Sequence, residues 1–463
     1  MMVTMMCFRL RPSFPHLLSL RLLGTAASRT VAVKPPDHDS AALAFEDPSA
    51  FRVKSWSELL RALGVFHFCS FPLLVNNCGK LMSIARTLLG RRGFSLLLRP
   101  TVYAQFVAGE SESEISQSME KMSLLRLRPM LAVPIEEDLG ESTGYEKRYD
   151  DNMDAMLECV RISHSNAWCK DPMMQLKITA LLSPELCVKL TTVTAQQLYD
   201  LSLLVRALDG EPVSFPGLNE SEAAHFLCAL RRLNKIGEAS ANKVRVLVDA
   251  EYTYMNPALS LVTMAMMKKF NKDGVWIWNT YQCYLKESRS LLLEALRLSQ
   301  DEGFCLGVKL VRGAYMDKER KLAEKEGCLD PIHQSWEDTN DSYNGSLDVM
   351  LRVISQSPER YRIIVASHNE ESVRLAAQQM EELGIDKDGG SVCFGQLLGM
   401  CDHVSLTLAK EGYAVYKSVP YGSVDDTLPY LVRRAQENRT VLQGIRKERD
   451  LLRQELYRRI CAR

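Results

Sequence analysis

The sequence of 463 residues carries no net charge, because 57 lysines and arginines balance 57 aspartates and glutamates. No overall field attracts nucleic acid, so we expect no nucleic-acid partner. The 13 cysteines form no Cys-x-x-Cys pair and no Cys/His cluster at zinc spacing, so we expect no metal and mostly buried, reduced thiols of an intracellular protein. No apolar run reaches the roughly 18 residues of a membrane span. No Gly-x-Gly-x-x-Gly follows a candidate strand, so the Rossmann fingerprint is lacking.

The first 36 residues also lack acidic residues, since the first of these is Asp37. Arginines, serines, threonines and leucine pairs in this segment are typical of a mitochondrial transit peptide, with a disordered basic tail as the alternative. We therefore expect a mitochondrial protein, in the matrix or on the inner membrane. Residues 40–124 indicate a helical arm. Its apolar stretch 64–75 and the basic stretch after it either pack on the main domain, which we favour, or dock on a membrane surface.

Residues 125–463 predict one large domain of alternating strands and helices. The expected strands are 129–138, 173–182, 244–252, 275–284, 306–315, 361–369, 391–400 and 413–422. The expected helices are 145–163, 258–271, 287–302, 345–357, 370–384 and 403–411, with a longer helical insertion at 184–243. Eight such units favour an α/β fold, a (β/α)8 TIM-like barrel with an N-terminal helical arm, over an open doubly wound sheet.

Nearly every predicted strand ends in polar residues, which barrel enzymes use to build an active site at the C-terminal strand ends. These residues are Glu136, Lys177, Asp249 with Glu251, Asn279 with Gln282, Lys309 with Arg312, Ser367 with His368, Gln396, and Lys417 with Ser418. Lys309 lies in a run that should be buried, so it either pairs with a carboxylate such as Asp249 or serves a bound anion, and both readings stay open. No nucleophile is evident beside His368, so we assign it a hydrogen-bonding role.

The stretch PYLVRRAQENR, residues 429–439, has an unusual polar face for a helix. Tyr430, Arg433, Arg434 and Glu437 follow the i, i+3, i+4, i+7 spacing that puts side chains on one face. Two adjacent guanidinium groups suit bidentate binding of a carboxylate. The alternative is a solvated basic face, which is less favoured because the apolar residues of this stretch occupy the other positions.

Six strings occur in order between about residues 173 and 460: DAEYTYMNPA, NTYQCYLK, VKLVRGAYMDKER, ASHNEESV, FGQLLGMCDHVS and VPYGSVDDTLPYLVRRAQEN. Together they resemble the proline dehydrogenase family of flavoenzymes. The resemblance implies that the barrel is distorted, that it holds FAD at the C-terminal strand ends, and that the arginine-bearing helix lies over the mouth.

The resemblance also implies roles for individual residues. Arg433 and Arg434 would bind the substrate carboxylate. The expected catalytic set is Lys177, Asp249, Tyr430, Arg433 and Arg434. The expected substrate pocket is Leu310, Tyr315, Leu397 and Ser418. The expected flavin-binding positions are Gln282, Lys309, Arg312, Ser367, His368 and Glu437. Lys309 stands where bacterial members carry an arginine near flavin N5. The positive charge is therefore kept, but the planar guanidinium, which can donate two parallel hydrogen bonds, is lost.

Ser418 stands where proline-specific members have a second pocket tyrosine. A serine leaves space for a substituent at C4 of the ring and brings its own donor and acceptor. The resemblance is therefore to the branch that oxidises trans-4-hydroxy-L-proline to 1-pyrroline-3-hydroxy-5-carboxylate, with L-proline and 1-pyrroline-5-carboxylate as the alternative pair. It implies hydride transfer from C5 to flavin N5. It also implies a ubiquinone-type acceptor, reached by peripheral contact with the mitochondrial inner membrane, because no nicotinamide motif is present.

Two other classes of function stay open at this point. Lysines at barrel strand ends also build Schiff-base aldolases and lyases. A catalytically inactive scaffold or amino acid sensor would use the same pocket without chemistry.

Overall fold

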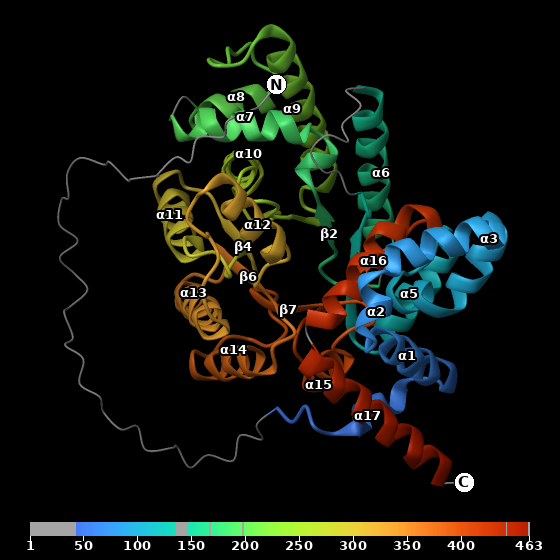
Figure 1. Ribbon diagram of the computed structural model, residues 1–463. Coiled ribbons are helices and arrows are strands. Elements are labelled where there is room, and N and C mark those ends of the chain that lie inside the picture. The colour runs from blue at the N-terminus through green and yellow to red at the C-terminus, as the bar shows by residue number, and fades with distance from the viewer. Residues whose placement is uncertain (1–42, 136–145, 166–167, 197–198, 441, 462–463) are drawn as a thin grey trace.

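The computed structural model describes residues 43–135, 146–165, 168–196, 199–440 and 442–461, and leaves the side chains of residues 436–445 undescribed. The transit peptide expected at 1–36 and the strand-end residue Glu136 therefore lie outside the described residues. Eight parallel strands close into a barrel in sequence order (Figure 1), which confirms the predicted fold. The strands are β1 (Leu127–Ala132), β2 (Met173–Leu176), β3 (Arg245–Val248), β4 (Ile277–Gln282), β5 (Leu306–Val311), β6 (Tyr361–Ala366), β7 (Val392–Leu397) and β8 (Val415–Pro420).

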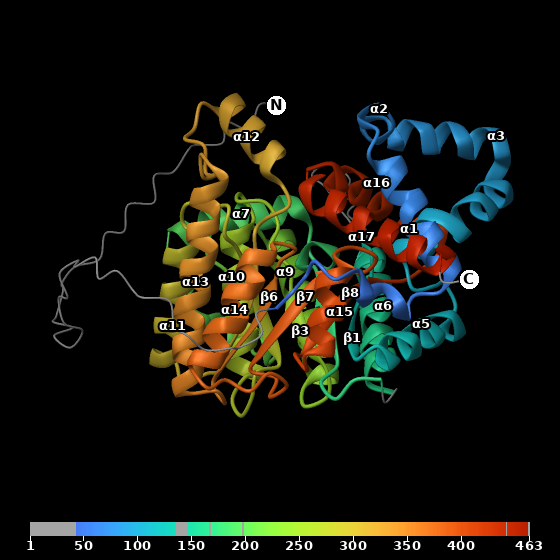
Figure 2. The same ribbon diagram turned by 90° about the horizontal axis from the view of Figure 1, so that it is seen from below.

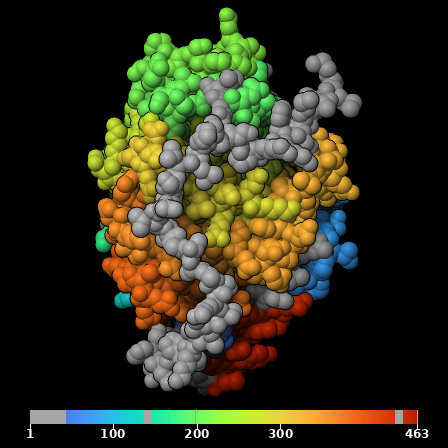
Figure 3. All heavy atoms as spheres, turned by 90° about the vertical axis from the view of Figure 1, so that its left-hand side faces the viewer, coloured from blue at the N-terminus to red at the C-terminus, as the bar shows by residue number. Residues whose placement is uncertain are grey.

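Helices cover the outside of the barrel. They are α6 (Glu146–Ser165), α10 (Asn256–Phe270), α11 (Ser288–Asp301), α12 (Met316–Glu326), α13 (Trp336–Gln356), α14 (Glu370–Glu382), α15 (Asp402–Lys410), α16 (Val424–Thr440) and α17 (Leu442–Cys461). The insertion between β2 and β3 forms the short turn η3 (Ile178–Ala180) and then α7 (Pro184–Ala195), α8 (Leu201–Leu208) and α9 (Glu220–Ser240). These last three helices, drawn in green, form one end of the molecule beside the yellow and orange outer helices (Figure 3).

Two features of the outer layer differ from the sequence prediction. Helix α13 begins at Trp336, nine residues before the expected 345, because Ser335 and Asp338 form a capping box that starts a helix within a polar stretch. Helix α12 was not expected, since its sequence is almost entirely polar; Gly327 ends it with φ 63°.

Large and small side chains alternate to fill the lower part of the barrel interior. Met130, Met173, Leu247, Trp278, Ile364, Cys393 and Tyr416, one from each strand except β5, form a buried cluster. On β5 the register partner of Trp278 is Gly307, where an added Cβ would lie 2.6 Å from the indole. The indole therefore occupies the space that a side chain on β5 would need. This layer closes the barrel below the C-terminal strand ends.

The N-terminal arm consists of η1 (Pro48–Val53), α1 (Trp56–Cys69), α2 (Pro72–Asn76), α3 (Cys78–Leu98), η2 (Arg99–Tyr103), α4 (Ala104–Phe106) and α5 (Glu112–Leu124). A second hydrophobic core joins this arm to α16. It brings Met82 and Phe94 of α3 together with Tyr430, Leu431 and Ala435 of α16, all buried. The helical arm expected from the sequence is thus present, and it packs against the helix that carries the arginine pair.

Eleven cysteines in the described part of the chain are free, and eight of them are buried, as expected for reduced thiols. None of the helices in the described ranges combines the length and the apolar character that crossing a bilayer requires.

Gly399, in the loop between β7 and α15, sets how closely the arm approaches the barrel. Its φ is 76°, and an added Cβ would lie 2.1 Å from the backbone oxygen of Gln105 in α4. Gly412 has a similar φ of 85° with nothing within 4 Å of an added Cβ. We predict that Gly399→Ala lowers the free energy of unfolding by about 2–5 kcal/mol, from backbone strain plus the clash. Gly412→Ala, which isolates the strain, should cost about 1–2 kcal/mol.

Urea unfolding of the two variants beside the original chain measures both values. Equal losses would contradict the close contact between arm and barrel at Gly399.

Candidate active site

The C-terminal half of the barrel interior is polar. Side chains alternate between the two faces of a strand, so residues two and four positions beyond the buried interior layer face the same way as that layer. Among the residues that this alternation places inward are Gln175, Lys177, Asp249, Thr280, Gln282, Lys309, Leu397 and Ser418. Six of the predicted site residues thus share one surface at the mouth: Lys177, Asp249, Gln282, Lys309, Leu397 and Ser418.

An ion pair lies near the centre of this surface. Lys309 Nζ donates a hydrogen bond to Asp249 Oδ1 over 2.6 Å, and Lys309 is only 8 % exposed. Of the two readings that the sequence left open for Lys309, the carboxylate partner is the one found. Nearby, burial raises the pKa of Glu251, an effect that the charge of Lys177 opposes, and Thr179 Oγ1 donates to Glu251 Oε1 over 2.7 Å.

Arg312, just beyond β5, is a cation held by neutral groups. Its guanidinium donates to Asn340 Oδ1 at 2.5 Å and to Ser372 Oγ at 2.8 Å, and its Nε lies 3.4 Å from Ser367 Oγ. The rings of Trp336 and Tyr343 lie 5.2 and 4.8 Å from its central carbon. Burial lowers its pKa, and no carboxylate of the described residues pairs with it. A half-buried cation whose hydrogen-bond partners are all neutral can accept an anionic group.

His368 is held as a neutral imidazole. The backbone N–H of Leu397 donates to its Nε2 over 3.3 Å, which requires that nitrogen to be unprotonated. Burial, together with the charges of Lys417 and Arg434, lowers the pKa of His368 to about 3. The hydrogen bond that His368 Nε2 accepts from Leu397 agrees with the hydrogen-bonding role predicted for His368.

Helix α16 buries Arg434 and leaves Arg433 half-buried. Arg434 is 5 % exposed and Tyr430 is 8 % exposed, and the guanidinium carbon of Arg434 lies 4.8 Å from the centre of the Tyr430 ring. The positive charge of Arg434 helps to lower the pKa of His368. The positive charge of Arg433 opposes the rise that burial causes in the pKa of Tyr315. Figure 2 places α16 and α12 at the same end of the barrel. The alternative prediction, that this helix presents a solvated basic face, is therefore wrong for Arg434. Glu437 belongs to α16, but its side chain is outside the description.

Tyr315, at the start of α12, contacts a residue that the sequence reasoning did not select. Its ring lies 4.4 Å from that of Tyr252, and Lys318 Nζ donates to the hydroxyl of Tyr252 over 2.7 Å. Burial raises the pKa of Tyr315. Tyr252 lies in the string DAEYTYMNPA, close to Asp249 and Glu251, so its position next to these residues could have indicated it.

Several polar or predicted residues lie elsewhere, because neighbours along a strand face opposite ways. Leu310 is fully buried in the main core, so the structure does not expose it at the mouth. Gln396 accepts from Ser405 of α15 over 3.0 Å, and Asn279 donates to Ser260 of α10 over 3.2 Å. Lys417 pairs with Asp402 of α15 at 2.8 Å. The expectation that every polar strand end serves one mouth is therefore wrong for Gln396, Asn279 and Lys417.

Lys417 belongs to a buried charge cluster that ties the arm to the barrel. Asp402 also contacts Lys54 of the arm at 2.7 Å. Although burial opposes ionisation, the charges of Lys417 and Lys54 hold the pKa of Asp402 below its usual value. Glu448 of α17 accepts hydrogen bonds from the backbone N–H groups of Cys401 and Asp402, each at 2.8 Å. This cluster could not be predicted from local sequence patterns, since its members come from distant segments.

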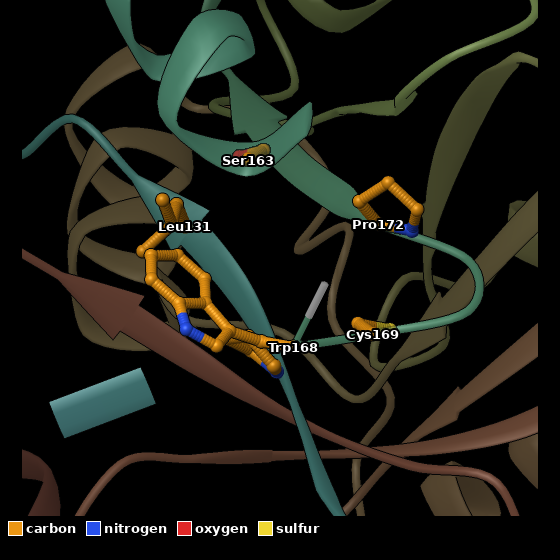
Figure 4. Close-up of a pocket in the computed structure, with 6 residues that line it drawn as sticks. Leu131, Ser163, Trp168, Cys169 and Pro172 are labelled. Carbon is orange, nitrogen blue, oxygen red and sulfur yellow. The ribbon is translucent and has the colours of Figure 1, made fainter. Parts of the chain in front are cut away.

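Two cavities lie away from the mouth. One, of about 10 Å³, is lined by residues near the starts of β1 and β2, among them Leu131, Ser163 and Trp168 (Figure 4). It has room for no more than about one water molecule. The other, of about 620 Å³, lies between the arm and the flank of the barrel and is bordered by Arg61 and Asp402. Neither contains the residues of the mouth.

The comparisons with known proteins agree with this arrangement. A family profile described as proline dehydrogenase matches residues 132–447. A hydroxyproline dehydrogenase of Xenopus laevis is 54 % identical over 98 % of this chain and 96 % of its own length, and one of Homo sapiens is 45 % identical over 92 % and 95 %. The human protein named proline dehydrogenase 1, mitochondrial, is 31 % identical over 89 % of this chain and 88 % of its own.

A solved structure shares the fold. Proline utilization A (PutA) from Bdellovibrio bacteriovorus, inactivated by N-propargylglycine, superposes with a TM-score of 0.61 at 22 % sequence identity. The match covers 86 % of this chain and 39 % of that one, so this chain spans about two fifths of the bacterial protein's length.

The neutral state of His368 predicts a pH dependence of stability. In the unfolded chain the imidazole binds a proton below its ordinary pKa of 6.5, whereas in the fold it stays neutral down to about 3. The unfolded state thus gains protons first, and stability falls as the pH drops below 6.5. We predict that His368→Gln removes up to about 1.4 kcal/mol per pH unit of this loss. Urea unfolding between about pH 7 and pH 5 measures it; identical pH slopes for both proteins would refute the assignment.

Proposed function

The chain belongs to the proline dehydrogenase family, and from this premise we propose that it is an oxidoreductase that converts trans-4-hydroxy-L-proline to 1-pyrroline-3-hydroxy-5-carboxylate. Relatives at 45 to 54 % identity over nearly the whole chain are named hydroxyproline dehydrogenase. Those named proline dehydrogenase are more distant, at 31 to 32 %. L-proline is therefore the alternative substrate, with 1-pyrroline-5-carboxylate as its product.

The observation that carries this proposal is the burial of Arg434 on α16. A guanidinium that is 95 % buried on this helix offers a planar pair of donors that can hold a carboxylate through two parallel hydrogen bonds. Arg433 lies on the same helix face, so the two forks can hold a carboxylate between them. The remaining polar surface below, with Lys177, Asp249 and Lys309, suits an amine ring rather than a large substrate.

We propose FAD as the cofactor, held at the C-terminal strand ends. The residues present fit such a group: Arg312 is a half-buried cation without a carboxylate partner in the described chain, and Lys309 supplies a second positive charge inside the barrel. Gln282, Ser367 and His368 add amide, hydroxyl and neutral imidazole groups of the kind that bind a polar heteroaromatic ring. Glu437 completes the proposed set. When bound, FAD accepts the hydride from C5 of the substrate.

The protein's own contribution to the reaction is orientation. The amine loses a hydride from C5 and a proton from nitrogen, and a C=N double bond forms. Both losses require the ring to stay in one orientation, which a bidentate clamp on the carboxylate provides. Arg433 and Arg434 serve as that clamp, while Tyr430, Tyr315 and Leu397 form the walls that exclude water. The Lys309–Asp249 pair keeps charge fixed below the ring, where it does not have to reorganise during the reaction.

Ser418 favours hydroxyproline over proline. Its hydroxyl donates to Gln175 Oε1 over 2.7 Å, and it is 7 % exposed on the inward face of β8. Two small polar groups beside the ring leave space and hydrogen-bonding capacity for a hydroxyl at C4. A tyrosine at this position would fill the same space with an aromatic ring.

Compartment and electron acceptor complete the proposal. Relatives of this chain are named mitochondrial, and we propose the same location, with residues 1–36 as a transit peptide. We propose a ubiquinone-type acceptor, reached by peripheral contact with the inner membrane. We propose that the chain consists of an arm at 40–124 and a catalytic barrel at 125–463, which contains the insertion 184–243.

Replacing Arg434 tests the clamp. Arg434→Met removes the charge and the fork but keeps the length and apolar packing of the side chain. We expect the Michaelis constant for hydroxyproline to rise about a hundredfold or more, since charge-assisted hydrogen bonds contribute about 1.5–3 kcal/mol each. Bound flavin, measured by its absorbance, should stay near normal. Arg434→Lys is the control for charge without the fork and should fall between. Unchanged substrate affinity in Arg434→Met would show that Arg434 does not bind the substrate carboxylate.

Replacing Ser418 tests substrate choice. We expect Ser418→Tyr to shift the ratio of kcat/KM values for hydroxyproline and proline toward proline by about tenfold or more, because the ring would crowd the C4 substituent. Ser418→Ala keeps the space and removes only the hydroxyl, so it separates crowding from hydrogen bonding. Steady-state kinetics with both substrates gives the ratio; the same ratio in the original chain and in Ser418→Tyr would show that another residue sets selectivity.

A further inference from the structure

The arm carries a surface that the reaction does not use. From Leu59 to Gly109 the chain has no acidic residue and six basic ones. Ten of the twenty large hydrophobic side chains that are exposed in the described chain also belong to this stretch. Exposed single leucines are common on proteins, but a concentration of this kind marks an interaction site.

The exposed residues gather on α2 and α3. Leu81, Ile84 and Leu88 follow the i, i+3, i+7 spacing of one helix stripe, with Ile84 and Leu88 56 and 79 % exposed. This stripe lies beside another one, which includes Met82 and packs on α16. Leu73 on α2 and Leu96, on the segment of α3 beyond its break at Gly90, are 80 and 75 % exposed. We call the side chains of Leu73, Leu81, Ile84, Leu88 and Leu96, with Lys80 and Arg92, the arm face.

The charges next to this surface are positive. Arg86 and Arg91 both contact Asp425 at the start of α16, at 3.1 and 2.6 Å, and so attach the arm to that helix. Lys80 and Arg92 are exposed and form no ion pair with any carboxylate in the described ranges. These two are therefore available to an external anion.

We propose that the arm face docks on an anionic lipid bilayer. Apolar side chains that are 40 to 80 % exposed suit insertion between acyl chains, which needs no matching shape, better than a shaped protein groove. The flanking lysine and arginine match anionic head groups. Figure 2 shows α2 and α3 at the same end of the molecule as α16 and α12. Docking would bring the mouth of the barrel close to the bilayer, where a quinone acceptor dissolves. The proposed function gives docking this purpose, but binding itself does not depend on catalysis.

The test is vesicle binding by the full chain. Vesicles of phosphatidylcholine containing about a quarter phosphatidylglycerol are sedimented with the protein, beside vesicles of phosphatidylcholine alone. The apolar variant is Leu73→Gln with Leu88→Gln and Leu96→Gln, chosen because these leucines are already exposed and glutamine keeps the helices. The matched control replaces three leucines outside the arm face, Leu124, Leu291 and Leu329, which are 80, 54 and 88 % exposed.

We expect the apolar variant to lose about tenfold or more in partitioning to the anionic vesicles, while the control binds like the original chain. Lys80→Gln with Arg92→Gln should weaken binding to the anionic vesicles and leave binding to pure phosphatidylcholine unchanged, whereas Lys243→Gln with Lys272→Gln, which replaces exposed lysines outside the arm, should change neither. Flavin reduction by hydroxyproline with a soluble dye as acceptor should be normal in all variants, so failure of the surface and failure of the enzyme are separable.

Two results would overturn the proposal. One is equal vesicle binding by the original chain and the apolar variant. The other is absence of vesicle binding together with a dimer in light scattering that the apolar variant converts to a monomer, which would make a second copy of the chain the occupant of the arm face.

Discussion

The site depends on how α16 is held. One face of this helix is buried against the arm through Leu431, Ala435 and the residues of α3, and this hydrophobic contact leaves the arginine face no direction but inward. The gain from burying these apolar groups offsets the cost of placing Arg434 away from water. Asp425 strengthens the same contact through Arg86 and Arg91. The arm is thus part of the active-site architecture even though it supplies no predicted catalytic residue.

Successive side chains of a strand point to opposite faces, so neighbouring polar residues face either the barrel interior or the outer helices. On β8, Ser418 faces the interior whereas its neighbour Lys417 faces the outer layer and pairs with Asp402. On β5, Lys309 faces Asp249 whereas Leu310 packs in the main core. Neighbouring polar residues therefore serve different purposes, one as part of the mouth and the other as a tie between barrel, arm and C-terminal helix.

Much of this could be predicted from the sequence. Each of the eight strands overlaps its expected range, because short β-branched runs between polar turns are a strong local signal, although the strands have only four to six residues and β1 begins two residues earlier than expected. The Lys309–Asp249 pair was foreseen as one of two alternatives, since a buried cation requires a partner. The inward placement of Arg434 could be inferred only weakly, because its cause lies in Phe94 and Met82, more than three hundred residues away in the sequence. The same long separation hid the Lys54–Asp402–Glu448 cluster. Helix α12 was missed because its stability comes from capping and tertiary contacts rather than from an apolar stripe.

The central claim is that the arginine face of α16 holds the carboxylate of a small cyclic amine against the polar interior of the barrel. The most direct measurement is a crystal structure of the protein with an unreactive five-membered ring carboxylate bound. We expect the carboxylate between the guanidinium groups of Arg433 and Arg434, with the ring facing Lys177 and Asp249 and its C4 edge toward Ser418. A carboxylate bound elsewhere, with those two arginines turned toward solvent, would contradict it.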